Sequence, residues 1–410
     1  MKDCAVPAHF PLYSTSAAHA AQINTLNPEL PQANVGLWFT RFYDGFDAAW
    51  EIDATSKGQF IEATVKLSDR QDNTCLQQVR AFAVRQRVLC EALGGQCMTL
   101  TTEAPLVTGT GLSHPVENGF TFHPTLGLPY LPAAGVKGLL RAWTEVWAGL
   151  SDDDRRERVA LWFGTAKGAE EPQEDAAGAL VFFDAVPADR VALECDVLTP
   201  HMGDWYEKGD RLSAQNFATV APGDWHSPVP SPFLVLKKGA KLQFGIAPRL
   251  TGHAAHDAAA RAAVAPALEA LKAALEWIGA GAKTAAGYGR MGSRPEAQRQ
   301  SDQDLADHRH RLAEQAAAKA RAQAKQAMSP ADLAMADLFD QRTDKNQDER
   351  AVLFSALKAG KLAEHRQEAA LRLKALMQEQ KRWKEKSEKK NPEKDQPHQD
   401  TLLVQKWLSA

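Results

Sequence analysis

Apolar positions recur with helical spacing in three stretches of the chain. The first runs from residue 73 to the Gly94-Gly95 pair, which ends the predicted helix. The second stretch covers residues 133–150 and begins after Pro132. Proline is tolerated in the first turn of a helix because its missing N–H would have no partner there. The third covers residues 264–278. The second stretch predicts a buried stripe of Val136, Leu139, Leu140, Trp143, Val146 and Trp147.

Shorter runs of β-branched and aromatic residues lie between these helices and predict strands. Residues 35–39 fit either a helix or a strand. Because strands and helices mix without strict alternation, we expect an α+β sheet with helices on one face rather than a doubly wound parallel sheet. The predicted strands cover residues 96–102, 120–122, 179–186, 193–198, 233–236 and 241–246, and the last two have the spacing of a hairpin.

Composition divides the chain into three parts. Residues 1–33 hold four prolines among Ala, Ser and Asn, which predicts an irregular arm. Residues 34–294 hold all of the predicted strands and form one mixed domain. Residues 295–410 lose the strand formers and are rich in Ala, Gln, Lys, Arg and Glu. They predict a helical extension that is broken at Ser329-Pro330 and again near Asn391-Pro392.

A charge-rich run lies inside this extension. Residues 381–394 carry seven basic and three acidic side chains, and Trp383 is the one aromatic among them. Mixed signs are typical of a solvated, frayed helix, so nonspecific RNA contact is the weaker interpretation of this run.

Length and charge narrow the class of protein. The chain has 410 residues and a mass of 44.8 kDa, which is enough for two or three domains. Its formal net charge is -3, so a nucleic-acid site must be a local patch. No apolar run is long enough for a membrane span, and residues 1–16 lack the pattern of a secretory signal. The five cysteines form no C-x-x-C pair, which predicts free thiols in a cytoplasmic protein rather than a zinc site or a disulfide framework.

The strongest local signal is a glycine cluster over residues 279–292. A phosphate-binding P-loop needs Gly before Lys-Thr and a preceding strand, but Ala282 stands before Lys283 and a helix precedes the cluster. Residues 287–292 match the G-x-G-x-x-G dinucleotide pattern, but they follow no strand and open no βαβ unit. Both nucleotide motifs are therefore rejected.

Without these motifs, the glycine cluster is a flexible backbone segment with two positive charges and one aromatic ring. Glycine N–H groups can approach an anion closely, Lys283 and Arg290 add positive charge, and the ring of Tyr288 offers a surface on which a base could stack. A tight turn that only permits helix–strand packing explains the same glycines equally well. The glycines concerned are Gly279, Gly281, Gly287 and Gly289.

A second signal lies at the start of the helix after Pro132. Lys137 and Arg141 are four residues apart and share a helix face close to the N-terminus, where free N–H groups favour anions. Gly138 costs helix stability, which suggests the close approach of another backbone. A solvated basic face over a buried stripe is the more ordinary interpretation.

Two histidines are candidates for acid/base chemistry. His201 follows Asp196 and precedes Asp204, Trp205 and Tyr206, whereas His123 stands in a Phe-His-Pro stretch. No second His or Cys has metal-ligand spacing, and no serine or cysteine nucleophile pairs with either histidine. A structural or RNA-contacting role is therefore favoured for His201.

Together these segments resemble the RAMP superfamily of CRISPR proteins. The Lys-Thr-x-x-Gly-Tyr-Gly stretch at residues 283–289 resembles the C-terminal glycine-rich loop of that superfamily, and residues 131–141 resemble its "proline, small residues, Lys-Gly, Arg" helix. Residues 125–130, 196–201 and 230–234 resemble the sixth-subunit family of type III-B CRISPR effector complexes. The resemblance covers residues near 34–292 and leaves the helical extension without an assignment.

The resemblance implies a ferredoxin-like, RRM-type core with insertions. It also implies a non-catalytic subunit that binds guide RNA and caps the filament of repeated backbone subunits near the guide's 3′ end. The partners implied are guide RNA, target RNA, the backbone RAMP subunits and the small helical subunit of the Cmr complex, with no membrane and no cofactor. The RNA contacts are expected from Lys137, Arg141, His201, Lys283, Thr284, Tyr288 and Arg290, and close backbone approach is expected at Gly138, Gly279, Gly281, Gly287 and Gly289.

Two other functions remain open from the sequence. A metal-independent, guide-processing endoribonuclease of the same superfamily would use His201 or His123, and the lack of a second His or Tyr at a partner spacing argues against it. A protein-interaction scaffold would use residues 295–410. The RNA-binding interpretation requires that the surfaces around Lys137 and Lys283 meet on one sheet.

Overall fold

The computed structural model describes residues 34–46, 49–165, 176–342, 347–387 and 391–409. The predicted arm at residues 1–33 lies outside them. The chain divides into two compact units, an N-terminal unit that ends at His308 and a C-terminal unit that begins at Arg309. Among the described helices, none combines the length and the apolar character that a membrane span requires.

The main sheet of the N-terminal unit is antiparallel throughout, with strand order β2-β6-β1-β7. Its strands are β1 (Gln96–Thr102), β2 (Leu180–Phe182), β6 (Lys241–Pro248) and β7 (Met291–Ser293). The short β3 (Val186–Pro187) also pairs with β6. The predicted strand over residues 179–186 is thus two short strands against one neighbour, and the run at 120–122 forms only an isolated bridge.

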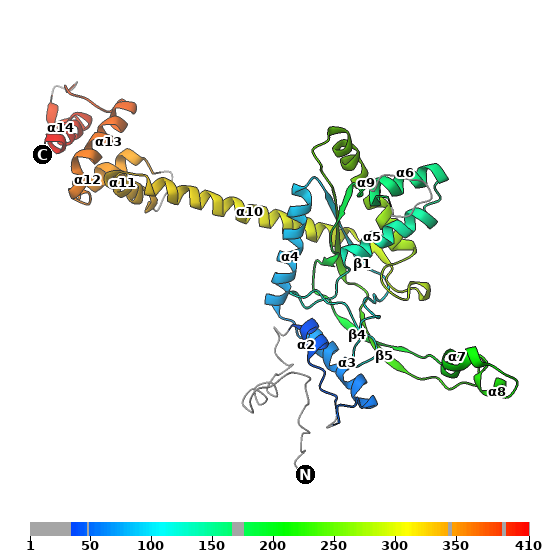
Figure 1. Ribbon diagram of the computed structural model, residues 1–410. Helices are drawn as coiled ribbons and strands as arrows, with labels where there is room; N and C mark the ends of the chain where they lie inside the picture. The colour runs from blue at the N-terminus through cyan, green and yellow to red at the C-terminus, as the bar shows by residue number, and fades with distance from the viewer. Residues whose placement is uncertain (1–33, 47–48, 166–175, 343–346, 388–390, 410) are drawn as a thin grey trace, which may run out of the picture. The chain divides into compact units, whose positions relative to one another are not determined.

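Helices cover both faces of this sheet, not one face as predicted. α4 (Asn73–Ala92) packs on one face, where Gln243 of β6 donates to the backbone oxygen of Ala83 at 2.8 Å. α5 (Ala133–Ala142) and α9 (Ala254–Trp277) contact the sheet from the other side (Figure 1). Nearly every residue of β6 is buried, whichever face it points to, because both faces carry a helix.

A second, two-stranded sheet holds β4 (Leu193–Leu198) and β5 (Ser231–Leu236). The chain between them carries α7 (Gly203–Lys208) and α8 (Phe217–Val220) on an arm that Figure 1 shows projecting from the sheets. The predicted hairpin between residues 233–236 and 241–246 is wrong. β5 pairs with β4 and β6 pairs with β1, so the short link between them carries the chain from one sheet to the other.

Two helices precede α4. α2 (Val35–Arg41) settles the ambiguity at residues 35–39 in favour of a helix, capped by the side chain of Asn34. α3 (Ala54–Asp69), which the pattern did not predict, is capped by Asp53. The ring of His114 stacks on the buried ring of Phe39, with centroids 4.1 Å apart.

The predicted helix at 133–150 changes its geometry halfway. After α5 the chain forms one π-helical turn, Trp143–Trp147, and a new helix, α6 (Asp152–Phe163), starts behind the cap Ser151. Val146 and Trp147 were expected in the buried stripe but are 70% and 62% exposed. The wider turn rotates both side chains away from the helix face that Val136 and Leu140 bury.

The C-terminal unit is helical, as predicted for the extension. Ser329 accepts a bond from the N–H of Asp332 and starts α11, which explains the predicted break at Ser329-Pro330. The helices are α10 (Pro295–Gln326, shared with the N-terminal unit), α11 (Pro330–Asp340), α12 (Glu349–Lys358), α13 (Arg366–Glu379) and α14 (Gln396–Ser409). Their core is built from Leu353, Leu357, Leu373, Met377, Val404 and Trp407.

Two expectations for this region differ from the structure. The division between the units falls inside α10, because its first turns bond to the N-terminal unit: Gln298 accepts from the N–H of Thr99 at 2.9 Å. The described residues from 381 to 387 are turn and coil rather than a frayed helix, since Lys381 takes a left-handed conformation with φ of 53° that ends α13.

Candidate functional site

A pocket of about 510 Å³ brings three distant segments of the N-terminal unit together. They are the loop after β1, the first turns of α5 and the glycine cluster that follows α9. The helix after Pro132 and the glycine cluster therefore line one pocket, whereas Lys137 and Lys283 are not among its lining residues. The lining residues are Thr108, Gly109, Thr110, Gly111, Thr121, Leu131, Pro132, Gly135, Leu139, Ile278, Gly279, Ala280, Gly281, Ala282 and Thr284.

The glycine cluster folds tightly onto the loop after β1. Ala282 donates its N–H to the oxygen of Val107 at 2.7 Å, and Gly289 donates to Pro105 at 2.8 Å. Gly281 and Gly289 have positive φ, and a Cβ there would lie 2.1 Å and 1.8 Å from backbone oxygens. Gly279 and Gly287 share the positive φ. The turn interpretation therefore accounts for Gly281 and Gly289, and it coexists with an exposed backbone surface at the pocket.

Thr108 is a site residue that the sequence analysis missed. It is 6% exposed, it lines the pocket, and its hydroxyl has no hydrogen-bond partner among the described residues. A buried hydroxyl without a partner costs about 1–3 kcal/mol, and an ordered water or a ligand is one way to satisfy it. The signal that could have found it is the Thr-Gly-Thr-Gly run at residues 108–111.

The polar groups of the pocket are hydroxyls and backbone amides. None of its lining residues carries a formal charge. Such a surface can hydrogen-bond sugar hydroxyls and phosphate oxygens through fixed donors, but it offers no acid or base for proton transfer.

Lys283 and Thr284 stand at the edge of this pocket. Thr284 lines it. Lys283, half-buried and with φ of 61°, places its ammonium 5.2 Å from the ring centroid of Phe233 on β5. A cation over an aromatic face is held in place, so the charge of Lys283 is fixed beside the pocket rather than free.

Tyr288 attaches the glycine cluster to the second sheet. Its hydroxyl donates to the carboxylate of Asp196 on β4, and its ring packs partly against Phe233. This hydrogen bond, with added burial, raises the pKa of Tyr288 to about 12. The structure thus joins two segments that the sequence analysis had considered separately, and it gives Tyr288 a positioning role besides the predicted stacking surface.

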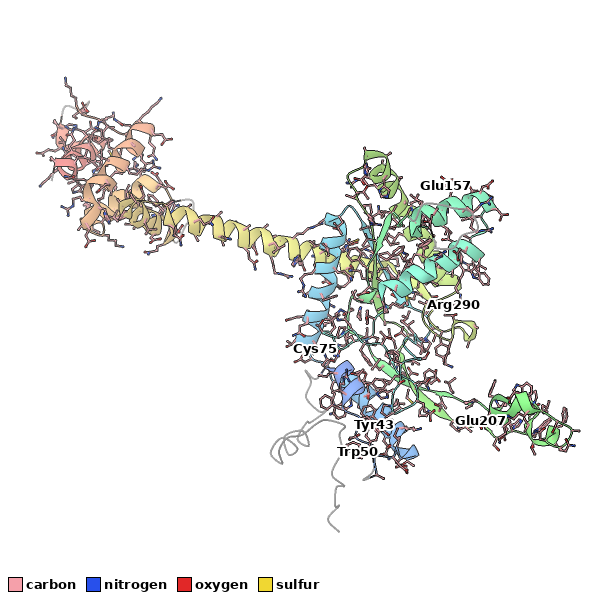
Figure 2. The ribbon with its side chains drawn as sticks, in the orientation of Figure 1. Tyr43, Trp50, Cys75, Glu157, Glu207 and Arg290 are labelled. Atoms are coloured by element: carbon pink, nitrogen blue, oxygen red, sulfur yellow. The ribbon has the colours of Figure 1, made fainter. Side chains whose placement is uncertain are left out.

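Arg290 lies within the glycine cluster, and its side chain reaches the end of α9. Its side chain is exposed, and its Nε donates to the backbone oxygen of Glu276 at 3.0 Å. A cation bonded to the last carbonyls of a helix stabilises that helix end. Figure 2 shows Arg290 on the side of the unit that carries α5 and α9.

Lys137 and Arg141 turn away from the pocket. Gly135 and Leu139 of α5 line it, and Lys137 is two residues from each, which is about half a helical turn. Arg141 pairs with Glu145 at 2.7 Å. Neither of the basic side chains of this helix lines the pocket that Gly135 and Leu139 share with the glycine cluster. No atom of the described chain lies within 4 Å of a Cβ at Gly138, so the expected close approach is not made within the chain.

The N-terminus of α5 already holds an anion. The N–H of Ala133 donates to a carboxylate oxygen of Asp184 at 2.6 Å, and Pro132 offers no side-chain cap. The helix dipole that was expected to favour an external anion is therefore partly satisfied by this carboxylate.

His201 lies outside the pocket. It is exposed beyond the end of β4, and its Nδ1 is 3.3 Å from the oxygen of Thr199. The nearby Asp204 forms an ion pair with Lys208 at 2.5 Å. Figure 2 shows Glu207 far out on the same arm, apart from Arg290. The structure does not bring His201 to the other predicted contact residues.

His123 has a tyrosine neighbour that sequence spacing did not reveal. Its ring packs between Phe82 and Tyr130, with centroids 4.8 Å and 5.3 Å away. Its Nδ1 accepts from the N–H of Leu126 at 3.3 Å. Burial lowers the pKa of His123, and the charge of Asp184 opposes that shift. The imidazole is therefore neutral near pH 7 and held by packing.

Comparisons with known proteins match parts of this chain. Residues 99–291 match the model of the RAMP superfamily, a range that includes most of the main sheet, α5, α9 and the pocket. A curated relative, CRISPR system Cmr subunit Cmr6 of Pyrococcus furiosus, is 26% identical in a match that covers 46% of this chain and 65% of the relative.

Two solved structures are also similar. A chain of the cryo-EM structure of the type III-B Cmr-beta bound to cognate target RNA has a TM-score of 0.42 and 21% identity, over 58% of this chain and 71% of that one. The crystal structure of Cmr6 from Pyrococcus furiosus has a TM-score of 0.27 and 23% identity, over 49% of this chain and 98% of that one.

Proposed function

We propose that this chain, whose residues 99–291 match the model of the RAMP superfamily, is a non-catalytic, guide-RNA-holding subunit of a type III-B CRISPR effector complex. It would cap the filament of backbone subunits near the 3′ end of the guide and contact the neighbouring backbone and small helical subunits. The curated relative, a Cmr subunit of which the match covers 65%, supports this assignment. The observation that carries it is the pocket with the unpartnered hydroxyl of Thr108.

We also infer a ferredoxin-like core. Along the chain the main elements follow the order β1-α5-β2-β6-α9-β7, which is a β-α-β-β-α-β series. The strand order β2-β6-β1-β7 is the antiparallel order that this series forms when both helices cross one face. The pocket then lies where the two crossover helices meet the sheet.

The pocket suits RNA better than DNA. Its hydroxyls and amides can bond phosphate oxygens, which both nucleic acids carry, and the ribose 2′-OH, which only RNA carries, while Lys283 supplies a positive charge beside it. Since its lining residues include no titratable side chain, the pocket would hold the strand without breaking it.

The endoribonuclease alternative gains one observation, the contact of His123 with Tyr130. A neutral imidazole beside a phenol is a possible acid/base pair. The bond from Leu126 to Nδ1 and the packing on both ring faces favour a structural role instead. Loss of a defined, metal-independent cut in repeat RNA on His123→Ala would establish the alternative.

The substitution Thr108→Val tests the proposal. It removes the hydroxyl and keeps the shape of the side chain. We expect the affinity for guide RNA, measured by fluorescence anisotropy with the full chain, to fall roughly threefold to tenfold, which corresponds to one lost hydrogen bond. The unfolding temperature should stay the same or rise, because no protein partner is lost.

Thr99→Val is the matched control. Thr99 is also buried with an unpartnered hydroxyl, but it lies on β1 and does not line the pocket. Its variant should bind RNA like the unmodified protein. Equal affinities for the two variants would contradict the proposed site.

A further inference from the structure

The two units carry charge of opposite sign. Residues 309–410 hold 21 Lys and Arg against 15 Asp and Glu, a net +6, whereas residues 1–308 hold 27 against 36, a net -9. The overall balance of -3 conceals this difference. A separate basic unit has its own electrostatic field, which falls off over about 10 Å at ordinary salt.

Much of the acidic charge of the C-terminal unit is used inside it. Asp337 and Asp340 both accept from Lys325, at 2.8 Å and 2.6 Å. Asp348 caps α12 and accepts from Gln380. Asp332 bonds with the hydroxyl of Ser329 at the cap of α11. The charge of these carboxylates is already included in the net +6, and none of the four forms an ion pair with Lys381 or Arg382.

The basic side chains that follow the end of α13 are not used in this way. Lys381 and Arg382 are both exposed and make no ion pair within the described chain. We call these two residues the α13 basic face. The dipole of a helix favours cations at its C-terminus, where this face lies.

The backbone turn after α13 holds the face together. The N–H groups of Arg382 and Trp383 both donate to the oxygen of Met377, at 2.7 Å and 3.1 Å. Lys374 lies over the ring of Trp383 at 5.1 Å, and this indole packs on the core of the unit. The chain therefore folds back onto the helix end and keeps Lys381 and Arg382 beside it.

We propose that the α13 basic face binds the phosphate backbone of single-stranded RNA without sequence preference. Exposed, unpaired cations on a rigid helix end fit closely spaced phosphates, and binding would release the counterions of the strand. The choice of RNA as the polyanion rests on the proposed function. The face itself lies outside the RAMP domain and would give the chain a second, purely electrostatic contact with RNA.

The double substitution Lys381→Glu/Arg382→Glu tests this face in the full chain. The probe is a fluorescent single-stranded RNA of unrelated sequence, titrated at several salt concentrations. We expect weaker binding at low salt. The slope of log affinity against log salt should decrease by about 1.4, which corresponds to two lost phosphate contacts on a single strand.

Arg155→Glu/Arg156→Glu is the matched control. It changes the net charge equally on α6 of the N-terminal unit, where both arginines already pair with Asp152 and Asp153. An equal loss in this control would mean that bulk charge alone acts, and it would overturn the proposal. Lys381→Gln/Arg382→Gln, which only neutralises the face, should give a smaller loss in the same direction.

Two results separate this face from the pocket. Thr108→Val should weaken binding of guide RNA and leave the salt slope unchanged, whereas the α13 variants should reduce the slope even where the pocket proposal fails. An unchanged slope in Lys381→Glu/Arg382→Glu would overturn the proposal. If the slope is unchanged but the variant no longer assembles with the other subunits, the face instead binds an acidic protein partner.

Discussion

The pocket of the N-terminal unit and the α13 basic face of the C-terminal unit use different physics. The pocket is lined by uncharged residues, and its shape depends on backbone bonds and on glycines such as Gly281, where a Cβ would lie 2.1 Å from a backbone oxygen. The basic face consists of long, exposed side chains around one helix end. Geometry therefore dominates in the first region and net charge in the second.

This difference predicts opposite sensitivities. A fixed array of donors loses affinity when one atom is removed and changes little with salt. A cluster of solvated charges tolerates a conservative substitution and responds strongly to salt. Three experiments test this difference between the two regions.

The largest effect is expected from the core of the C-terminal unit. Leu373 is fully buried there, and Leu373→Ala should destabilise the unit by about 2–5 kcal/mol through lost packing and a cavity. In calorimetry of the full chain, only one of two transitions should move, and RNA contacts of the pocket should persist. A common shift of both transitions would show that the two units unfold together and would weaken the comparison.

A smaller effect is expected from the glycine cluster. Gly289→Ala places a Cβ 1.8 Å from the oxygen of Ala280 at a positive φ, so it should cost about 2–4 kcal/mol and abolish the pocket. Gly287→Ala is the control, because its φ is also positive but nothing lies within 4 Å. It should cost only about 1 kcal/mol of backbone strain, as measured by chemical unfolding. Equal costs would mean that strain, not close packing, requires these glycines.

The smallest effect is expected from alkaline pH. The pKa of Tyr288 is raised from 10.0 to about 12, so its bond to Asp196 stabilises the fold fully below pH 10.0 and loses this contribution as pH rises through 12. Tyr288→Phe lacks the bond at every pH. The difference in unfolding free energy between the two proteins should therefore shrink over this range. A constant difference would show that the hydroxyl does not hold the loop.

Local sequence patterns were sufficient to predict an element wherever its own residues determine where it begins and ends. The pattern that starts at residue 73, closed by Gly94-Gly95, located α4, and the boundaries of β1 and β4 agree with the structure. Pro132 and Ser329 marked helix starts because the first turn of a helix has fixed chemical requirements.

Local sequence patterns failed where segments far apart in the chain determine the strand pairing, the orientation of a side chain or its hydrogen-bond partner. β5 and β6 are separated by a hairpin-length link, yet Leu236 bridges to Leu106, and this pairing draws β5 away from β6. The orientation of Lys137 depends on which face of α5 meets the pocket, and helical spacing alone does not determine that. Thr108 becomes a candidate only when the tertiary fold leaves its hydroxyl without a partner.

The bond between Tyr288 and Asp196 also bears on how the protein folds. It joins residues 92 positions apart and connects two sheets, so both sheets must form before it can close. A contact that closes after the rate-limiting step leaves the rate of folding unchanged and slows unfolding. If this bond closes after the rate-limiting step, Tyr288→Phe unfolds faster and folds at an unchanged rate, so the hydroxyl prolongs the lifetime of the contact between the two sheets.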